Sequence, residues 1–153
     1  MTPISSDVQI SQAALAQLDA VVPLFDAYRQ FYKQPSDLAG AWQFLRERIE
    51  HAESVIFLAS QNGRALGFTQ LYPSFSSLSM KPLWVLNDLY VVPDARKQGV
   101  GAALLRRAQQ FAIARQARGL SLATAVDNPA QRLYEQMGWV RDTQFYHYLW
   151  IAG

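Results

Sequence analysis

Hydrophobic and polar positions follow two periods along the first half of this chain, and these periods predict its first elements. The alternation at Val8 and Ile10 indicates a short strand, because side chains on a strand point to opposite faces in turn. Apolar positions then recur every three or four residues over residues 18–32 and 38–49, which is typical of two amphipathic helices.

A hairpin is predicted next. Residues 54–60 form a compact apolar run and residues 65–72 a second one, as expected for paired strands. Asn62-Gly63 lies between them, and this dipeptide supplies the positive φ angles that a tight hairpin turn needs. The serine-rich stretch 73–82 is predicted to be a loop.

Residues 84–92 are apolar on both faces and predict a central strand that is covered on both sides. The helical spacing over residues 99–118 predicts the helix that follows, and the alternation over 120–124 predicts another strand. Because a helix connects these two strands, we expect them to be parallel.

The C-terminal pattern predicts a short helix after Asn128 that ends at Gly138, with glycine in its usual place beyond a helix. Residues 139–140 and 144–151 then predict a final antiparallel pair that closes the sheet. The fold class is therefore α/β (α+β), with a mixed, mostly antiparallel sheet of six to seven strands and helices on both faces.

Size and composition narrow the classes of protein. At 153 residues the chain predicts a single domain, 1–153. Without cysteine it has neither disulfides nor a thiolate nucleophile, and with two histidines no metal site is predicted. A net charge of +2 gives no reason to expect a nucleic-acid partner, and no apolar run is long enough to span a membrane. The first seven residues lack the parts of a signal peptide, so we expect a cytoplasmic protein.

The most informative stretch joins the central strand to the long helix. Gly99 and Gly101 lie where the helix begins, and glycine lets a ligand approach the backbone closely. A helix N-terminus has unpaired N–H groups and partial positive charge, which suit a phosphate. Arg96 and Lys97 add cationic side chains. This stretch is neither a dinucleotide fingerprint, because Leu104 replaces the third small residue, nor a P-loop.

Two motifs give a closer identification. Arg-x-x-Gly-x-Gly at residues 96–101 directly follows a strand that ends in Val-Pro, and residues 128–139 read Asn-Pro-Ala-Gln-Arg-Leu-Tyr-Glu-Gln-Met-Gly-Trp. In this order the two motifs resemble those of the GCN5-related N-acetyltransferase (GNAT) superfamily, and most of all its branch of polyamine and histone acetyltransferases. The resemblance covers essentially the whole chain and implies the GNAT fold, in which a parallel strand pair splays apart around acetyl-CoA.

The resemblance also implies which residues bind the cofactor. Backbone groups of Leu89, Tyr90 and Val91 would pair with the pantetheine arm, and the loop at residues 96–102 would hold the pyrophosphate. Asn128 would contact CoA as well; alternatively, it is a helix N-cap, because it lies one residue closer to Tyr134 than in relatives. The implied cofactor-binding set is Leu89, Tyr90, Val91, Arg96, Lys97, Gln98, Gly99, Val100, Gly101, Ala102, Asn128 and Ala130.

The same resemblance assigns catalytic residues. Tyr134 matches the tyrosine that protonates the departing CoA thiolate, and a phenol with an ordinary pKa of ~10 suits a thiol near ~8.5. Asn87 stands where relatives of this branch carry a glutamate beside the amine, and an amide cannot take a proton. Deprotonation is therefore expected through ordered water or by Asp88, unless the amine arrives neutral.

The acceptor side is predicted less sharply. Tyr28 and Tyr32 on the first helix can line an amine pocket, and Asp26, Asp37 or Glu47 can attract a cation; aromatic residues at this spacing are more often core. The alternating tail 144–150 suits either an edge strand or, as in relatives, a homodimer interface.

Two functions follow. The preferred one is an N-acetyltransferase that moves the acetyl group of acetyl-CoA to a primary amine of a polyamine, a small amino compound or a lysine-bearing peptide, without a covalent enzyme intermediate. The alternative is a CoA-binding regulatory or interaction module without turnover, which the replacement of the glutamate by Asn87 motivates.

Overall fold

The computed structural model of the chain describes residues 3–153. The chain forms two compact units, one that runs up to Ala123 and one that spans Thr124–Gly153. The first unit contains β1 (Val8–Gln12), the 3-10 turn η1 (Leu15–Gln17), α1 (Leu18–Phe31), α2 (Leu38–Glu50), β2 (Val55–Gln61), β3 (Arg64–Ser76), β4 (Lys81–Val91), the 3-10 turn η2 (Pro93–Ala95), α3 (Val100–Ala114) and β5 (Leu120–Ser121). The second unit contains α4 (Gln131–Gln136).

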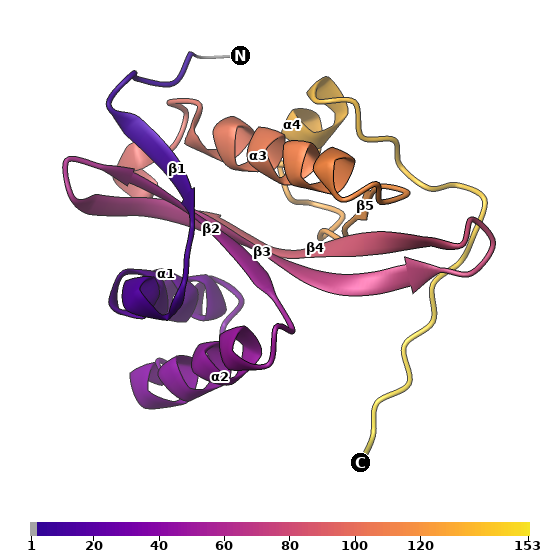
Figure 1. Cartoon of the computed structure of the whole chain (residues 1–153), viewed down its shortest axis with the longest axis horizontal. Helices are drawn as coiled ribbons and strands as arrows, with labels where there is room; N and C mark the ends of the chain where they lie inside the picture. The colour runs from indigo at the N-terminus through magenta and orange to yellow at the C-terminus, as the bar shows by residue number, and fades with distance from the viewer. Residues whose placement is uncertain (1–2) are drawn as a thin grey trace. The chain divides into compact units, whose positions relative to one another are not determined.

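The five strands form one sheet in the order β1-β2-β3-β4-β5. Neighbours are antiparallel from β1 to β4, whereas β4 and β5 are parallel, which confirms the predicted crossover through α3. In Figure 1, α1 and α2 lie on one side of the sheet and α3 lies on the other. The predicted mixed sheet with helices on both faces is thus confirmed, with five strands in the described residues instead of six to seven.

The alternation of side chains along β2 explains why both faces are covered. Ile56 and Leu58 belong to the buried cluster that α1 and α2 form with the sheet. Phe57 points the other way, and its ring meets that of Phe111 on α3 at 5.7 Å between centroids. Because successive residues face opposite sides, a strand that is apolar throughout needs helices on both faces.

The turn between β2 and β3 confirms the predicted hairpin. Asn62 and Gly63 have φ angles of 50° and 79°, and Gln61 pairs with Arg64 across them. Both central residues therefore adopt the left-handed conformation that a two-residue hairpin requires.

The loop predicted over residues 73–82 is wrong. β3 continues to Ser76 and β4 begins at Lys81, so only a short turn separates them. Pro73 is tolerated within β3 because β2 begins at Val55 opposite Leu71, so β3 pairs with β4 alone beyond that point.

β4 contains a bulge in the middle of the sheet. Gln70 pairs with Asp88, whereas its neighbour Leu71 pairs with Leu86. Asn87 is therefore the extra residue on β4, and such a residue re-aims the side chains around it and increases the local twist.

β5 is shorter than predicted. It covers Leu120–Ser121 and pairs only with Trp84 and Val85, whereas a strand over residues 120–124 was expected. From Leu86 to Val91, β4 therefore has no strand beside it on the β5 side. α3 likewise ends at Ala114, before the predicted residue 118.

The predicted final strand pair is wrong as well. Within residues 3–153, neither 139–140 nor 144–151 pairs with any strand. The alternating side chains of this tail are exposed; Tyr148, for example, is 92 % exposed. Alternation makes a segment fit for a sheet, but only hydrogen bonds to a neighbouring edge make it a strand.

Candidate active site

The open edge of β4 is the first part of the site. The amide of Val92 donates to the carbonyl of Leu66 on β3, 2.9 Å away. This bond shows which residues of β4 direct their backbone groups toward β3. In an antiparallel pair, every second residue directs both backbone groups to the partner strand. Leu89 and Val91 therefore turn their backbone groups to the open side, whereas those of Tyr90 face β3.

This edge is a ready-made partner for an extended ligand with amide groups, because unpaired backbone N–H and C=O groups need hydrogen bonds. One of its groups is already used within the chain. The carbonyl of Val91 accepts from Nε of Arg96 at 2.8 Å, and the Arg96 guanidinium lies 5.5 Å from the ring centroid of Tyr90. Arg96 thus ties the edge to the loop that follows.

Gly67 lets β3 approach this part of β4. A Cβ atom at Gly67 would lie 2.6 Å from the carbonyl oxygen of Tyr90 and 3.2 Å from Cα of Val91. We expect Gly67→Ala to cost about 1–3 kcal/mol in the free energy of unfolding and to weaken CoA binding, because β4 must move. Denaturant unfolding and calorimetry with CoA measure both. Gly119→Ala is the matched control, since no atom lies within 4 Å of its added Cβ; equal effects of the two variants would contradict the expectation.

The loop between β4 and α3 is the second part of the site. Lys97 and Gly99 have φ angles of 62° and 84°, and Gly99 is the N-cap of α3. These two left-handed residues turn the backbone of the loop just before the helix begins. The first N–H groups of α3, from Val100 to Ala102, have no intrahelical acceptor. Unpaired N–H groups at a helix start suit an anion, and the phosphate loop stays a prediction.

A neighbouring acid is neutralised. Asp94 lies in η2, close to this loop, and both of its carboxylate oxygens bind the Arg64 guanidinium at 2.8 Å. Its hydrogen bond to Arg64 lowers the pKa of Asp94, so the carboxylate stays charged and paired. Gln98 also contacts this turn, because its side-chain amide donates to the Asp94 carbonyl at 3.0 Å.

Asp88 is the buried acid of the site. It is 2 % exposed, and its carboxylate accepts from the amide of Gln70 at 2.6 Å and from that of Asn87 at 2.8 Å. Burial raises the pKa of Asp88, and the two amide donors lower it by less. A buried carboxyl with a raised pKa is typical of an acid–base residue.

Asn87 contacts both the Asp88 carboxylate and Tyr28 on α1. Its side chain, on an exposed residue at the bulge, reaches Asp88, and its carbonyl accepts from the Tyr28 hydroxyl at 3.2 Å. The Tyr32 ring lies tilted beside that of Tyr28, with 5.1 Å between the ring centroids, and Tyr32 is 45 % exposed. The structure therefore places Tyr28 against the bulge of β4, with Tyr32 beside it, although Tyr28 also packs against the core.

The acids predicted to attract a cation have other partners. Asp26 is buried and clamps the segment between α1 and α2: it accepts from the amide of Asp37 at 2.8 Å, from the Ser36 hydroxyl at 2.7 Å and from the Gln30 side chain at 3.0 Å. Asp37 caps α2 by accepting from the Gly40 amide at 2.9 Å. Both acids are explained by the turn that they hold.

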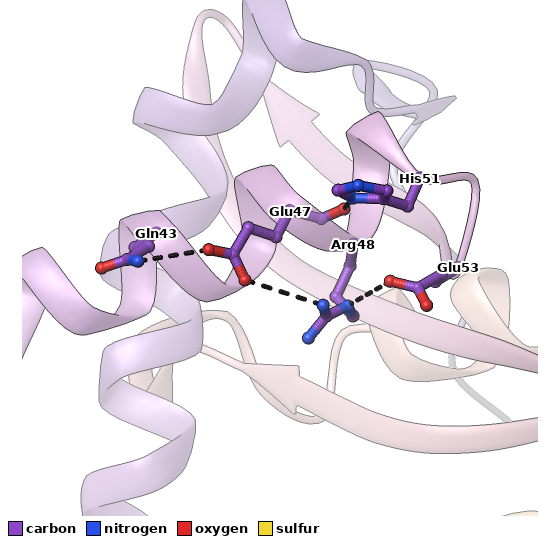
Figure 2. Close-up of polar contacts among 5 residues, drawn as sticks. All are labelled: Gln43, Glu47, Arg48, His51 and Glu53. Atoms are coloured by element: carbon purple, nitrogen blue, oxygen red, sulfur yellow. Dashed lines mark hydrogen bonds and ion pairs between the residues drawn. The ribbon is translucent and has the colours of Figure 1, made fainter.

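Glu47 lies in a polar network along α2, as Figure 2 shows. Its carboxylate accepts from Gln43 at 3.2 Å and lies 3.7 Å from the Arg48 guanidinium, which also pairs with Glu53 at 3.0 Å. The ring of His51 contacts the Glu47 carbonyl at 2.8 Å. The charge of Glu47 is therefore offset within its own surroundings.

Removing the Asp26 clamp tests its structural role. We expect Asp26→Ala to lower the free energy of unfolding by about 1–3 kcal/mol, since it leaves the Asp37 amide and the Ser36 hydroxyl without their acceptor. Hydrogen bonds, first that from Asp37, lower the pKa of Asp26. The carboxylate therefore stabilises the fold above its ordinary pKa, and this contribution is lost as pH falls through the lowered value. Urea unfolding at pH 7 and pH 3 measures it; a larger loss at pH 3 than at pH 7 would contradict this role.

In the second unit, Asn128 opens the turn before α4. Its side-chain oxygen accepts from the Ala130 amide at 2.9 Å, whereas the N-cap of α4 is Ala130 itself. Asn128 thus forms an Asx turn ahead of the helix and is not the cap that the alternative proposed. Tyr134 is the buried residue of α4, and its ring lies 6.0 Å from that of Trp139.

Two residues near the site were not predicted. Gln70 lies within a buried stretch of β3, and a polar residue in such a run was the available signal. The ion pair of Arg64 with Asp94 could not be predicted from a local pattern, because the two residues are 30 positions apart in the chain. Among residues 3–153, no group of three or more His, Cys, Asp and Glu side chains could hold a metal ion, and no helix is long and apolar enough to cross a membrane.

Comparisons with known proteins agree with this geometry. The acetyltransferase (GNAT) family matches residues 21–139. An uncharacterized N-acetyltransferase of Bacillus subtilis (strain 168), YhfO, is 51% identical over 142 residues, which cover 92% of this chain and 95% of that protein. The crystal structure of a probable acetyltransferase superposes with a TM-score of 0.90 at 44% identity and covers 95% of this chain and 98% of its own.

A more distant structure shares the fold. It is an aminoglycoside N-acetyltransferase, AAC(6')-Iy, in complex with CoA, with a TM-score of 0.78 at 20% identity over 99% of this chain and 100% of its own. The open edge of β4 leads into the start of α3, and the family match defines the class. This chain belongs to the acetyltransferase (GNAT) family and is an acetyltransferase; enzymes with this fold use acetyl-CoA.

Proposed function

We propose that this chain transfers the acetyl group of acetyl-CoA to a primary amine by direct attack, without a covalent enzyme intermediate. The observation that carries this proposal is the unpaired edge of β4, which leads straight into the anion-binding start of α3. The two features lie in the order in which pantetheine and pyrophosphate follow each other in coenzyme A. Acetyl-CoA supplies an activated thioester.

Each part of the site has a task in this proposal. The backbone groups of Leu89 and Val91 hold the pantetheine arm, and the amides from Gly99 to Ala102 hold the pyrophosphate with help from Lys97. An edge N–H directed at a developing oxyanion is typically worth ~2.7–4 kcal/mol. Arg96 lies between the edge of β4 and the start of α3, so its guanidinium can bind either the pantetheine arm or the pyrophosphate. Asn128 and Ala130 are proposed as further CoA contacts, on the resemblance alone.

Proton transfer is proposed for two residues. Asp88 takes the proton of the amine, directly or through water, because its raised pKa gives a stronger base than an ordinary carboxylate. Asn87 orients the amine or that water. Tyr134 gives a proton to the departing thiolate, a role that rests on its place in the motif at residues 128–139.

The acceptor is proposed to approach Tyr28 and Tyr32, since Tyr28 reaches the bulge of β4. The acids of α1 and α2 already have partners, so the aromatic pair supports an amine with an apolar portion better than a long polycation. A polyamine, a small amino compound and a lysine side chain all stay candidates. Membership in the polyamine and histone branch, and a homodimer through the tail, stay predictions.

A screen of amines by CoA release tests the proposal. Spermidine, small amino compounds and a lysine peptide are each offered with acetyl-CoA. Turnover with at least one amine is expected, and mass spectrometry should place the acetyl group on nitrogen. Binding of CoA by calorimetry without turnover on any amine would instead favour a binding module.

A further inference from the structure

Gln70 and Asp88 form a deeply buried polar contact within the sheet. Gln70 is 0 % exposed and Asp88 is 2 % exposed, and they face each other across β3 and β4. Nε2 of Gln70 lies 2.6 Å from Oδ2 of Asp88. By strand alternation, the pair shares its face with Phe68 and Tyr90, so it lies under α1 and α2.

The second atom of the Gln70 amide is unsatisfied. Its Oε1 is buried and has no hydrogen-bond partner within residues 3–153. A buried acceptor without a donor is costly, so such an atom calls for an explanation. The two ends of a glutamine amide have nearly the same shape, and rotation by half a turn exchanges donor and acceptor. The orphaned oxygen would then face the carboxyl of Asp88.

The exchange matters because a carboxyl needs different partners in its two forms. An ionised carboxylate only accepts, so its Oδ2 needs the N–H of Gln70; a protonated carboxyl donates from one oxygen and still accepts at the other, so an O–H at Oδ2 needs the Gln70 oxygen. In either orientation one end of the amide meets Asp88 and the other stays unpaired. Neither orientation satisfies the whole amide, and the protonation state of Asp88 selects between them.

No cation decides the state of Asp88. Within the described part of the chain it makes no ion pair, and its other polar partners are the amide of Asn87 and the hydroxyl of Thr69, which donates to the Asp88 carbonyl at 2.8 Å. The titratable and charged groups near this pair are Tyr72, on which both Asp88 and Arg48 act, and Tyr28, whose hydroxyl donates to the Asn87 carbonyl. Burial, and next the charge of Asp88, raise the pKa of Tyr72, so this phenol stays neutral.

We propose that Gln70 is a positioning residue for Asp88, whose side-chain amide turns over as Asp88 gains and loses the proton of the acceptor amine. This inference rests on the proposed role of Asp88 as base. In the resting state the N–H of Gln70 holds Oδ2, while Asn87 holds Oδ1 on the exposed side. When the proton arrives, the Gln70 oxygen accepts it in a hydrogen bond, so the carboxyl keeps its orientation in both states.

The first test follows both side chains by NMR without acetyl transfer. In the wild-type protein, the side-chain amide signals of Gln70 and the carboxyl carbon of Asp88 are expected to shift with the same midpoint as pH is varied. In Asp88→Asn the Gln70 signals should stop titrating. Gln70 signals that stay constant while Asp88 titrates would overturn the proposal.

The second test compares pH–rate profiles of kcat/KM. Gln70→Met keeps the volume but removes the donor to the carboxylate, so the acid limb should move about one pH unit upward, with about a tenfold loss on the acid side. KM for acetyl-CoA should stay the same. Gln9→Met, at an exposed position of β1, is the matched control and should leave the profile unchanged. A uniform loss at every pH without a shift would indicate a merely structural role and overturn the proposal.

A third variant guards against a misfolded Gln70→Met. Gln70→Glu restores hydrogen bonding in one protonation state, and the two carboxyls should titrate as a coupled pair with a higher second midpoint than Asp88 alone. An unchanged midpoint would overturn the proposal. If Asp88→Asn keeps full activity and its pH profile, the role of Asp88 as base fails, while the NMR titration still decides whether Gln70 follows its charge.

Discussion

Replacing Tyr134 by phenylalanine is expected to lower kcat by about 10²–10⁴-fold, because general acid catalysis typically contributes that much. Without the phenol, the CoA thiolate must leave unprotonated or take its proton from water. The change removes one hydroxyl from α4 and leaves the ring that packs beside Trp139. KM for acetyl-CoA should therefore change far less than kcat. CoA release under saturating substrates measures the effect.

Tyr146→Phe is the matched control for this variant, since the same atom is removed from a side chain that is 90 % exposed. It should keep wild-type activity. The role of Tyr134 would have to be abandoned if both variants retained full kcat, or if Tyr134→Phe lost activity only in proportion to a lost folded fraction, as circular dichroism reports.

Replacing Asp88 by asparagine is the second large expected effect. The amide cannot accept a proton, so we expect kcat/KM at neutral pH to fall about 10²-fold or more and the acid limb of the profile to disappear. In the wild-type enzyme, activity should fall as pH drops below the raised pKa of Asp88, since only the ionised carboxylate is a base. A pH series with the best amine from the screen measures both.

The contribution of Asp88 to the free energy of unfolding should change with pH in the opposite direction to the activity. Because burial raises the pKa of Asp88, the folded chain binds this proton more tightly than the unfolded chain does. The stability that Asp88 contributes is therefore greatest at low pH and declines as pH rises from its ordinary pKa through the raised one. Above the raised pKa the buried charge is a cost, so there Asp88→Asn should unfold at the same or higher denaturant concentration than the wild-type chain. An inactive variant that is also much less stable would argue for a structural role.

Local sequence patterns predicted the structure correctly where the conformation depends on neighbouring residues. The Asn62-Gly63 turn formed as predicted because both residues tolerate positive φ. The glycine at position 99 likewise marked the start of α3, where the chain takes a left-handed step before the helix. The parallel direction of β4 and β5 was predicted from the helix between them and is confirmed, whereas β1 and β2 are antiparallel although α1 and α2 lie between them in the chain.

Partners distant in sequence caused the errors. Residues 73–82 were predicted as a loop because serine and proline weaken a strand, yet β3 and β4 pair on to Ser76 and Lys81. The tail 144–151 alternates like a strand and has no partner edge in the described sheet. In both cases the pairing partner decided the outcome, and local propensity did not.

Motifs and short-range periodicity were enough to identify the family, the order of most elements and the loop that begins α3. The surroundings of Asp88, in contrast, follow from the folded chain alone. The bulge at Asn87, the contact of Gln70 across the sheet and the engagement of Asp26 by the turn before α2 all arise from pairings between distant segments. The physical reason is that burial and hydrogen-bond partners set the pKa of a carboxyl, and both are properties of the folded chain.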